Sequence, residues 1–249
     1  MSCLKLNCQW WQNWDYSFSP PDKSHSLALQ HVIVDSNCLV LSKKVKNLGF
    51  WLGRSLLFDT HVSKVISNGY HLLKNISKIR RFLSIPQLSV LCTSTILSRI
   101  DYCNSLFYGM SKSNISKLQG LQNAAARLIY GRRKRDGVSD LFKYLHWLPV
   151  EARIYFKVIL LAFKCLHGLA PSYLSDLIIL LDANNQRVHM PYFSTKFGDR
   201  SFSHAGPRLW NSLPLYLRKV DSLVAFKAQL KYYLFNNLDV FKSNITRLR

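Results

Sequence analysis

The pattern of apolar and polar positions divides the chain into a short β-forming segment and a long series of helices. Residues 31–41 (HVIVDSNCLVL) and 43–52 (KKVKNLGFWL) are rich in β-branched or aromatic residues and are separated by a short polar step. This composition is typical of strands, so we expect the two segments to pair as a β-hairpin. Residues 1–30 are expected to be poorly ordered, because positions 8–30 show no two- or 3.6-residue period and contain two consecutive prolines.

A long amphipathic helix is predicted to begin at Asp59, whose carboxylate can accept the free N–H groups of a first turn. Apolar or small residues recur at alternating steps of three and four and fall within an arc of about 100°. They are Val62, Val65, Gly69, Leu72, Ile76, Ile79 and Leu83. An arc of about 100° roughly opposite them holds the basic residues Lys64, His71, Lys74, Lys78 and Arg81. The helix is therefore expected to bury one face and to expose cations on the other.

Two further helices complete a predicted three-helix bundle. The first begins after the cap Ser84 and continues to Phe107, with a stop near Gly109. The second runs from Ser113 to a stop at Gly131. Short turns between three consecutive helices favour compact packing.

The rest of the chain is predicted to form more helices, at 139–146, 150–165, 171–181 and 223–234, with loops or short strands at 182–205. The expected fold class is therefore mainly α, with a short N-terminal β-hairpin, a three-helix bundle and a further helical C-terminal region. The expected parts are 1–30, poorly ordered; 31–58, the hairpin; 59–135, the bundle; and 136–249, the helical C-terminal region.

Composition and sequence favour a globular protein that is neither secreted nor membrane-spanning. The 249 residues are 48% hydrophobic, enough for a buried core. No signal-peptide pattern is present, and no apolar run approaches the roughly 20 residues that span a bilayer. The six cysteines are scattered without a CxxC pair, so we expect reduced thiols and no zinc site. We expect a nuclear or cytoplasmic location, neither secreted nor membrane-spanning.

Charge gives the strongest functional indication. The formal net charge is +21, and residues 50–135 hold 14 Lys+Arg against two Asp. A phosphate backbone is the most frequent partner of such a concentration, because each contact releases condensed counterions. We therefore interpret Lys64, Lys74, Lys78 and Arg81 as nucleic-acid-binding residues. An anionic membrane, an acidic protein or a plain solvated helix surface are the alternatives.

A second basic cluster, GRRKRDG, lies directly after the bundle. It places four consecutive cations between two glycines: Arg132, Arg133, Lys134 and Arg135. These residues are also candidates for phosphate contacts. A nuclear-import signal and an exposed basic loop are equally open interpretations.

The groups that catalysis would need are missing from the sequence. No phosphate-binding loop, nucleophile elbow or HExxH motif occurs. Two-metal phosphoryl transfer requires clustered carboxylates, whereas the twelve Asp and the single Glu are dispersed and no two are adjacent. We expect no enzymatic activity, no cofactor or metal, and no small-molecule substrate.

Five phrases in this order resemble the polyprotein of LINE-type, non-LTR retrotransposons. They are VKNLG (45–49), SRIDYCNSLFYG (98–109), LQGLQNAAARLI (118–129), LHWLPVEARIYFKVILLAFKCLHGLAPSYLSDL (145–177) and GDRSFSHAGPRLWNSLP (198–214). The resemblance covers about residues 45–238 and corresponds to the region after the reverse transcriptase palm. It implies a palm-end hairpin, a thumb at about 59–131 that grips the template–primer duplex, and catalytic aspartates upstream of this hairpin. MSCLKLN (1–7) resembles the segment after those aspartates, and the likeness stops at Cys8, which indicates a frameshift, deletion or splice.

The resemblance and the charge together predict a truncated, non-catalytic fragment that binds RNA or an RNA–DNA duplex without sequence preference. The alternative is a helical protein-interaction fragment, or a translated relic without selected function. In that case we expect apolar surface around Phe50, Trp51 and Phe58, uncovered by a missing palm, to favour self-association.

Overall fold

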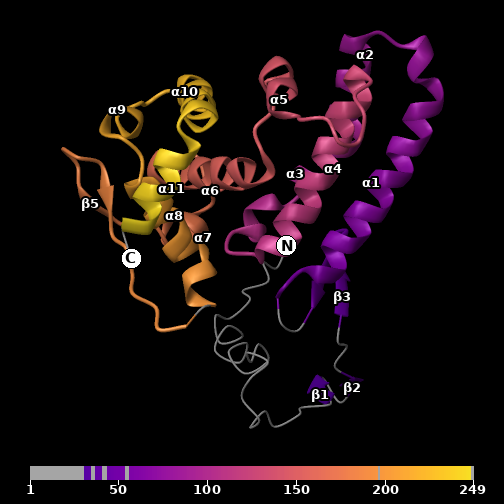
Figure 1. The fold of residues 1–249 in the computed structure, drawn as a ribbon. Helices are drawn as coiled ribbons and strands as arrows, with labels where there is room; N and C mark the ends of the chain where they lie inside the picture. Colours follow the sequence, from indigo (N-terminus) through magenta and orange to yellow (C-terminus); the bar gives the residue numbers. More distant parts are fainter. Residues whose placement is uncertain (1–30, 35–36, 41–43, 54–55, 196, 248–249) are drawn as a thin grey trace, which may run out of the picture. The chain divides into compact units, whose positions relative to one another are not determined.

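The computed structural model describes residues 31–34, 37–40, 44–53, 56–195 and 197–247, and these residues are mainly helical (Figure 1). A β-hairpin precedes the helices, so the predicted fold class is confirmed. The chain divides into two compact units, residues 1–64 and residues 65–249. The segment 1–30, expected to be poorly ordered, lies outside the described residues.

The first unit contains two antiparallel hairpins where the sequence pattern predicts one. β1 (His31–Val34) pairs with β2 (Asn37–Val40), and β3 (Lys44–Asn47) pairs with β4 (Phe50–Gly53). The second hairpin turns at Leu48-Gly49, where both residues are left-handed, with φ of 46° and 85°. Two left-handed residues form the tight turn that matches the twist of paired strands. Each predicted strand therefore forms a hairpin of its own, and in the second hairpin the two-residue turn hardly interrupts the apolar composition.

A small core joins this second hairpin to the first turn of helix α1. Phe50 and Phe58 are buried, with ring centroids 5.4 Å apart, and Phe50 also stacks on buried His61 at 3.9 Å. The Nδ1 atom of His61 accepts a hydrogen bond from the backbone N–H of Trp51 at 3.4 Å. Phe50 and Phe58 are therefore not exposed, and Trp51 is half-buried, whereas the neighbouring Val45 and Leu48 are exposed; self-association through this surface stays a prediction.

Helix α1 (Asp59–Ile79) begins where the sequence predicts, but its inner face turns away from the predicted stripe. Val62, Gly69, Leu73 and Ile76 are buried, whereas Ile79 is 45% exposed. Steps of three and four residues average 3.5 per turn, and a straight α-helix has 3.6, so the predicted stripe drifts by about 20° every seven residues. The predicted burial of Ile79 is therefore wrong, and Leu72 is only half-buried beside the buried Leu73.

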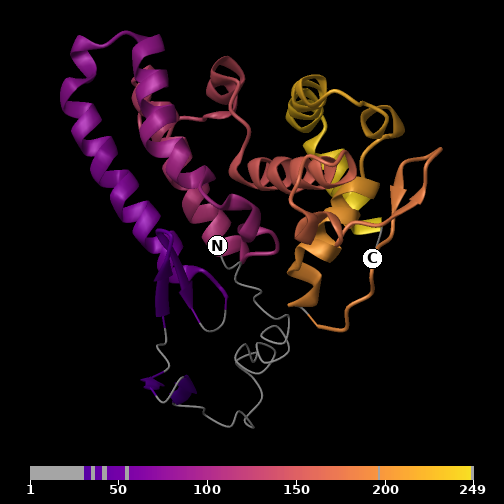
Figure 2. The ribbon, with the colours of Figure 1, turned by 180° about the vertical axis from the view of Figure 1, so that it is seen from behind.

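The helices that follow α1 complete the predicted bundle (Figures 1 and 2). After the 3₁₀ turn η3 (Arg80–Phe82) come α2 (Ile85–Cys92), the π-helical turn η4 (Thr93–Leu97), α3 (Ser98–Asp101), the 3₁₀ turn η5 (Asn104–Phe107) and α4 (Lys112–Tyr130). The cap at Ser84 is confirmed, since its N–H donates to Oε1 of Gln87 at 2.9 Å. The predicted single helix to Phe107 is wrong beyond Asp101, because Cys103 is left-handed (φ 53°) and breaks it.

Helix α4 lies beside α1 in both ribbon views (Figures 1 and 2). The two helices approach closely at Gly69, where a Cβ atom would lie 2.4 Å from Cδ2 of the buried Leu121. Ser111 caps the start of α4 by accepting from the N–H of Asn114 at 3.3 Å. Left-handed Gly131 (φ 68°) ends the helix, so the predicted stop is confirmed.

The C-terminal region packs around α6 (Val150–Leu166), which follows α5 (Ser139–Leu145), both as predicted. Phe163 of α6 stacks on Phe226 at 4.2 Å, and Trp210 is fully buried beside them. The remaining elements are α7 (Ser172–Ser175), β5 (Leu180–Asp182), β6 (Arg187–Val188), η6 (Gly198–Arg200), α8 (Phe202–Asn211), α9 (Leu215–Arg218), α10 (Leu223–Asn236) and α11 (Leu238–Arg247). The helix predicted at 223–234 is α10.

Residues 171–181 do not form the predicted helix. They contain only the single turn α7, and the apolar run that follows enters the hairpin of β5 and β6. The carboxylate of Asp182 accepts the N–H groups of Asn184 and Asn185 at 2.8 and 3.2 Å. This turn reverses the chain immediately after β5, so the apolar residues of 177–181 continue as an extended segment.

Three polar contacts tie α3 and α4 to the start of α6. Asp101 accepts hydrogen bonds from the guanidinium of Arg153, with Nε at 2.8 Å from Oδ1. Gln119 accepts from the N–H of Val150, and Gln122 donates to the carbonyl of Leu148, each at 2.9 Å. The amide of Gln119 thereby satisfies one of the free N–H groups in the first turn of α6.

Candidate nucleic-acid interface

The basic face of α1, which we define as Lys64, Lys74, Lys78 and Arg81, is fully accessible. All four side chains are exposed, as is His71 on the same face. Within the described ranges, no carboxylate lies at ion-pair distance from these four cations. The predicted separation of a cationic face from a buried face is therefore present, and no carboxylate of the described residues neutralises these cations.

Arg80, directly before Arg81, has a structural role that the predicted stripe missed. Its Nε donates to the carbonyl of Leu128 at 2.6 Å, and its guanidinium packs where a Cβ of Gly131 would be. Arg80 lies 18 residues after Val62, which is five full turns, so it is on the inner face. A cation at this position satisfies a free carbonyl and opposes the dipole at the end of α4. An α-helical period of 3.6 residues, counted from Val62, would have identified it.

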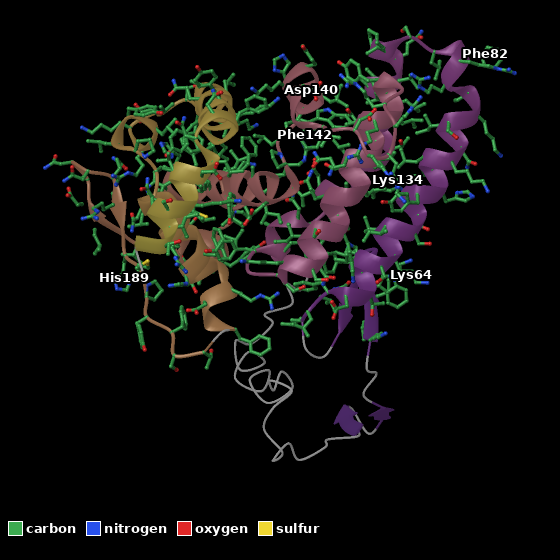
Figure 3. The ribbon with its side chains drawn as sticks, viewed as in Figure 1. Lys64, Phe82, Lys134, Asp140, Phe142 and His189 are labelled. Carbon is green, nitrogen blue, oxygen red and sulfur yellow. The ribbon has the colours of Figure 1, made fainter. Side chains whose placement is uncertain are left out.

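The contact between Arg80 and Leu128 brings together the two basic features of the sequence. The end of α1 is fixed at the C-terminal end of α4, from which the basic loop, residues 132–135, continues (Figure 3). All four side chains of the basic loop are exposed. Arg132 forms an ion pair with Asp140, with Nη2 and Oδ2 3.1 Å apart and both side chains about half exposed.

The basic loop has a defined backbone. The N–H of Arg133 donates to Oδ2 of Asp136 at 2.7 Å, and Nε of Arg127 donates to the Asp136 carbonyl at 3.0 Å. Both acids of this loop region, Asp136 and Asp140, are therefore engaged. The side chains of Arg133, Lys134 and Arg135 have no carboxylate partner in the part of the chain that the structure describes.

Two exposed aromatic side chains flank these cations, and the sequence pattern did not single them out. Phe82, in the turn after α1, is 71% exposed. The Cζ atom of the Arg81 guanidinium lies 4.7 Å from the centroid of the Phe82 ring. Tyr144 of α5 is 70% exposed and contacts Tyr130 at the end of α4, with centroids 6.3 Å apart. Figure 3 shows Phe82 at the outer end of α1.

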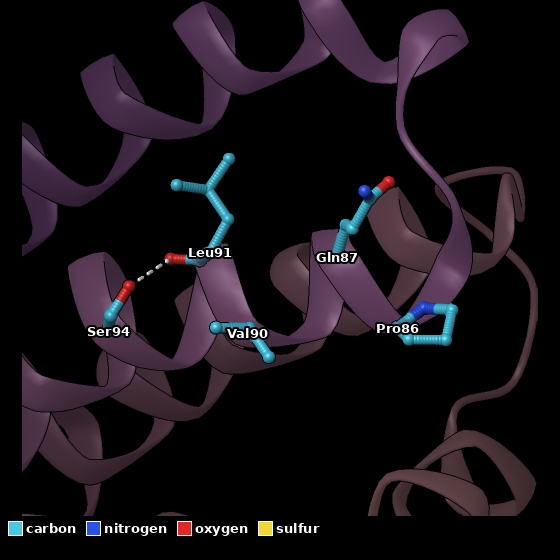
Figure 4. Close-up of a pocket in the computed structure, with 5 residues that line it drawn as sticks. All are labelled: Pro86, Gln87, Val90, Leu91 and Ser94. Atoms are coloured by element: carbon cyan, nitrogen blue, oxygen red, sulfur yellow. Dashed lines mark hydrogen bonds between the residues drawn. The ribbon is translucent and has the colours of Figure 1, made fainter.

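A shallow groove of about 390 Å³ lies along α2 (Figure 4). Its lining residues are Pro86, Gln87, Val90, Leu91 and Ser94. None of them has an ionisable side chain, and the hydroxyl of Ser94 donates to the carbonyl of Leu91 at 3.1 Å. The groove therefore offers a phosphate no charge.

Ionisable groups inside the second unit serve packing. Burial raises the pKa of the Cys92 thiol to about 11, so this thiol stays protonated at neutral pH. Tyr155 donates to Glu151 at 2.8 Å, and Lys242 pairs with the other Glu151 oxygen at 2.5 Å, which joins α11 to α6. Burial, and then the Glu151 charge, raise the pKa of Tyr155.

The described residues contain no cluster of three His, Cys, Asp or Glu side chains suited to a metal ion. None of the helices in the described ranges combines the length and the apolar character that crossing a bilayer requires. Comparisons with protein families, with curated protein sequences and with solved structures find no match for the chain. Support for the candidate interface therefore comes from the exposure, charge and contacts of its own residues.

Proposed function

We propose that the chain binds RNA or RNA–DNA duplexes without sequence preference through the basic face of α1. The supporting observation is that four exposed cations without a carboxylate partner in the described ranges follow one face of α1 and of the 3₁₀ turn η3 directly after it. Each cation that meets a phosphate releases counterions and adds affinity without reading a base. The minor groove of an A-form duplex is wide and shallow, which suits backbone and 2′-OH contacts from a helix face.

We further propose that the chain is a non-catalytic fragment of a retrotransposon reverse transcriptase. The five sequence phrases support this origin, and the dispersed acids, none adjacent to another, support the lack of polymerase activity. Primer extension with template–primer, deoxynucleotides and Mg²⁺ or Mn²⁺ should give only background. Incorporation that persists through repurification would contradict this part of the proposal.

The binding proposal is tested by changing Lys64, Lys74, Lys78 and Arg81 together to Gln. If each cation contacts one phosphate, the negative slope of log K against log salt on duplex DNA should become shallower, with its magnitude reduced by about 3–4. Fluorescence anisotropy across a salt series measures this slope, with an RNA–DNA hybrid as a second probe. The fold should be retained, since exposed substitutions usually change stability by less than about 0.5 kcal/mol.

A matched control separates local contacts from net charge. Four exposed lysines outside the interface, Lys157, Lys219, Lys227 and Lys231, are changed together to Gln, which removes the same charge. This control variant should keep most of the wild-type slope. An unchanged slope in the α1 variant, or equal losses in the two variants, would show that the α1 face is only a solvated surface.

Protein interaction is the second candidate function, and a different surface supports it. Residues 165–186 are the longest stretch of the chain without Lys or Arg, and they include Asp176 and Asp182. This stretch exposes Leu169, Tyr173, Ile179 and Leu181 by 55–70%. Apolar exposure of this kind favours a protein partner. Duplex binding that is absent or insensitive to salt would favour this second function.

A further inference from the structure

We propose that the C-terminal end of α4 is a binding site for an unpaired nucleic-acid strand. Phe82 and Tyr144 would stack on bases, and the cations of the basic loop would contact phosphates. The inference rests on the proposed function in that the ligand is a nucleic acid. It assigns a different surface and a different state of the strand, single instead of paired.

The end of α4 lies between the end of α1 and α5 in both ribbon views (Figures 1 and 2). On one side, Arg80 bonds to the Leu128 carbonyl and fixes the turn that carries Phe82. On the other side, Tyr130 contacts Tyr144, and Arg132 pairs with Asp140. The turn after α1 and, far later in the sequence, the basic loop with α5 thus present their exposed side chains around one helix end.

Phe82 and Tyr144 offer ring surface that the fold does not use. Their exposed fractions of 71% and 70% are high for large aromatic side chains. Each ring is nevertheless positioned, Phe82 by the Arg81 guanidinium and Tyr144 by the Tyr130 ring. A positioned, exposed aromatic ring is the platform on which unpaired bases stack, and each such contact contributes substantially to binding.

The charge of the basic loop favours a polyanion. Asp136 accepts from a backbone N–H and Asp140 pairs with Arg132, which leaves Arg133, Lys134 and Arg135 to solvent within the described ranges. Sites that bind single strands typically combine cations along the phosphate backbone with aromatic side chains on which the bases stack. In a duplex the base faces are already stacked on each other, so Phe82 and Tyr144 distinguish the two states.

The test compares the double variant Phe82→Ala/Tyr144→Ala with the wild-type chain. A short oligouridine RNA and a duplex RNA of equal length serve as anisotropy probes. Loss of stacking should weaken binding of the single strand by at least about 10-fold, while binding of the duplex stays within about twofold, because the basic face of α1 is intact. The variant Phe82→Trp/Tyr144→Trp keeps two aromatic faces and should keep the single-strand affinity.

The control variant Tyr173→Ala/Tyr192→Ala removes two rings that are 70% and 91% exposed at other places on the chain. It should bind both probes like the wild-type chain. Circular dichroism and a melting curve verify that every variant is folded. We expect each variant to fold, because the substituted rings are exposed and exposed substitutions usually change stability little.

Three results with the RNA probes would overturn the inference. They are no oligouridine binding by the wild-type chain, equal losses of binding to both probes in the alanine variant, or an equal loss of oligouridine binding in the control variant. Loss of binding to phosphatidylserine vesicles without loss of RNA binding would assign the rings to a membrane and would also overturn it. Failure of the proposed function looks different, since the wild-type chain would then bind oligouridine but no duplex.

Discussion

Two neighbouring arginines at the end of α1 illustrate how position decides the role of a cation. Arg80 donates to the Leu128 carbonyl at 2.6 Å and is half-buried, whereas Arg81 is exposed and its guanidinium lies over the Phe82 ring. Hydrogen bonds from a charged donor contribute more to stability than neutral ones. Arg80 therefore belongs to the fold, and Arg81 is available to a ligand.

This difference predicts opposite outcomes for the same substitution. Arg80→Gln should lower the free energy of unfolding by about 1–2 kcal/mol, because the last carbonyls of α4 lose a charged donor. Arg81→Gln should change stability by less than about 0.5 kcal/mol and should weaken duplex binding. Urea unfolding and duplex anisotropy of the two variants measure both effects. Equal stability losses would show that the Leu128 contact contributes nothing.

At the scale of elements, local sequence signals predicted several helix ends. The starts at Asp59 and Ser84, the stop at Gly131 and the bounds of α5 and α6 follow from residues that act on their own backbone. Such signals are local, so they can be recognised without knowledge of the fold.

Long-range contacts determine the elements that sequence reasoning missed. The break after Asp101 coincides with its bonds to Arg153, 52 residues later, and to Asn104. In β6, the N–H of Val188 donates to the side chain of Asn211 at 3.1 Å, which holds the short hairpin against α8. At the interface, Phe82 and Tyr144 are separated by 61 intervening residues in the chain, and only the fold places both at the end of α4. No periodicity reveals contacts of this kind.

Changing Gly69 or Gly120 to alanine should shift the free energy of unfolding in opposite directions. Gly69→Ala should lower the free energy of unfolding by about 1–2 kcal/mol, because its Cβ would lie 2.4 Å from Cδ2 of Leu121, which is fully buried. Gly120→Ala should raise it by up to about 1 kcal/mol, since alanine favours the helix and the nearest atom, the Tyr70 hydroxyl oxygen, is 3.8 Å away.

Urea unfolding of the two single variants measures this contrast, and each serves as the control for the other. Stabilisation by both alanines would contradict the close approach of α1 and α4 at Gly69. Destabilisation by both would indicate that Gly120 has a packing role that its open surroundings do not show.

At the scale of the whole molecule, the net charge of +21 acts on folding as well as on binding. Cations repel one another in the folded chain, and salt screens this repulsion. Raising NaCl from about 0.01 M to about 0.15 M shortens the screening length from about 30 Å to about 8 Å. The melting temperature should therefore rise while duplex affinity falls.

Differential scanning fluorimetry and anisotropy in the same buffers measure the two trends. A melting temperature that falls with salt would mean that attractive ion pairs outweigh repulsion. The Gln variant of Lys64, Lys74, Lys78 and Arg81 should show a weaker rise, because four of the repelling cations are gone.

The polar contacts between α4 and α6 have a consequence for a chain that has been cut. The basic loop is exposed and rich in the residues after which trypsin cleaves, and it leads from α4 to α5. Yet Arg153 remains bound to Asp101, and Gln119 and Gln122 remain bound to residues 148–150, whether or not the peptide is intact between them. A single nick at 132–135 would therefore leave two associated pieces that elute as one particle, with α6 still seated against α3 and α4.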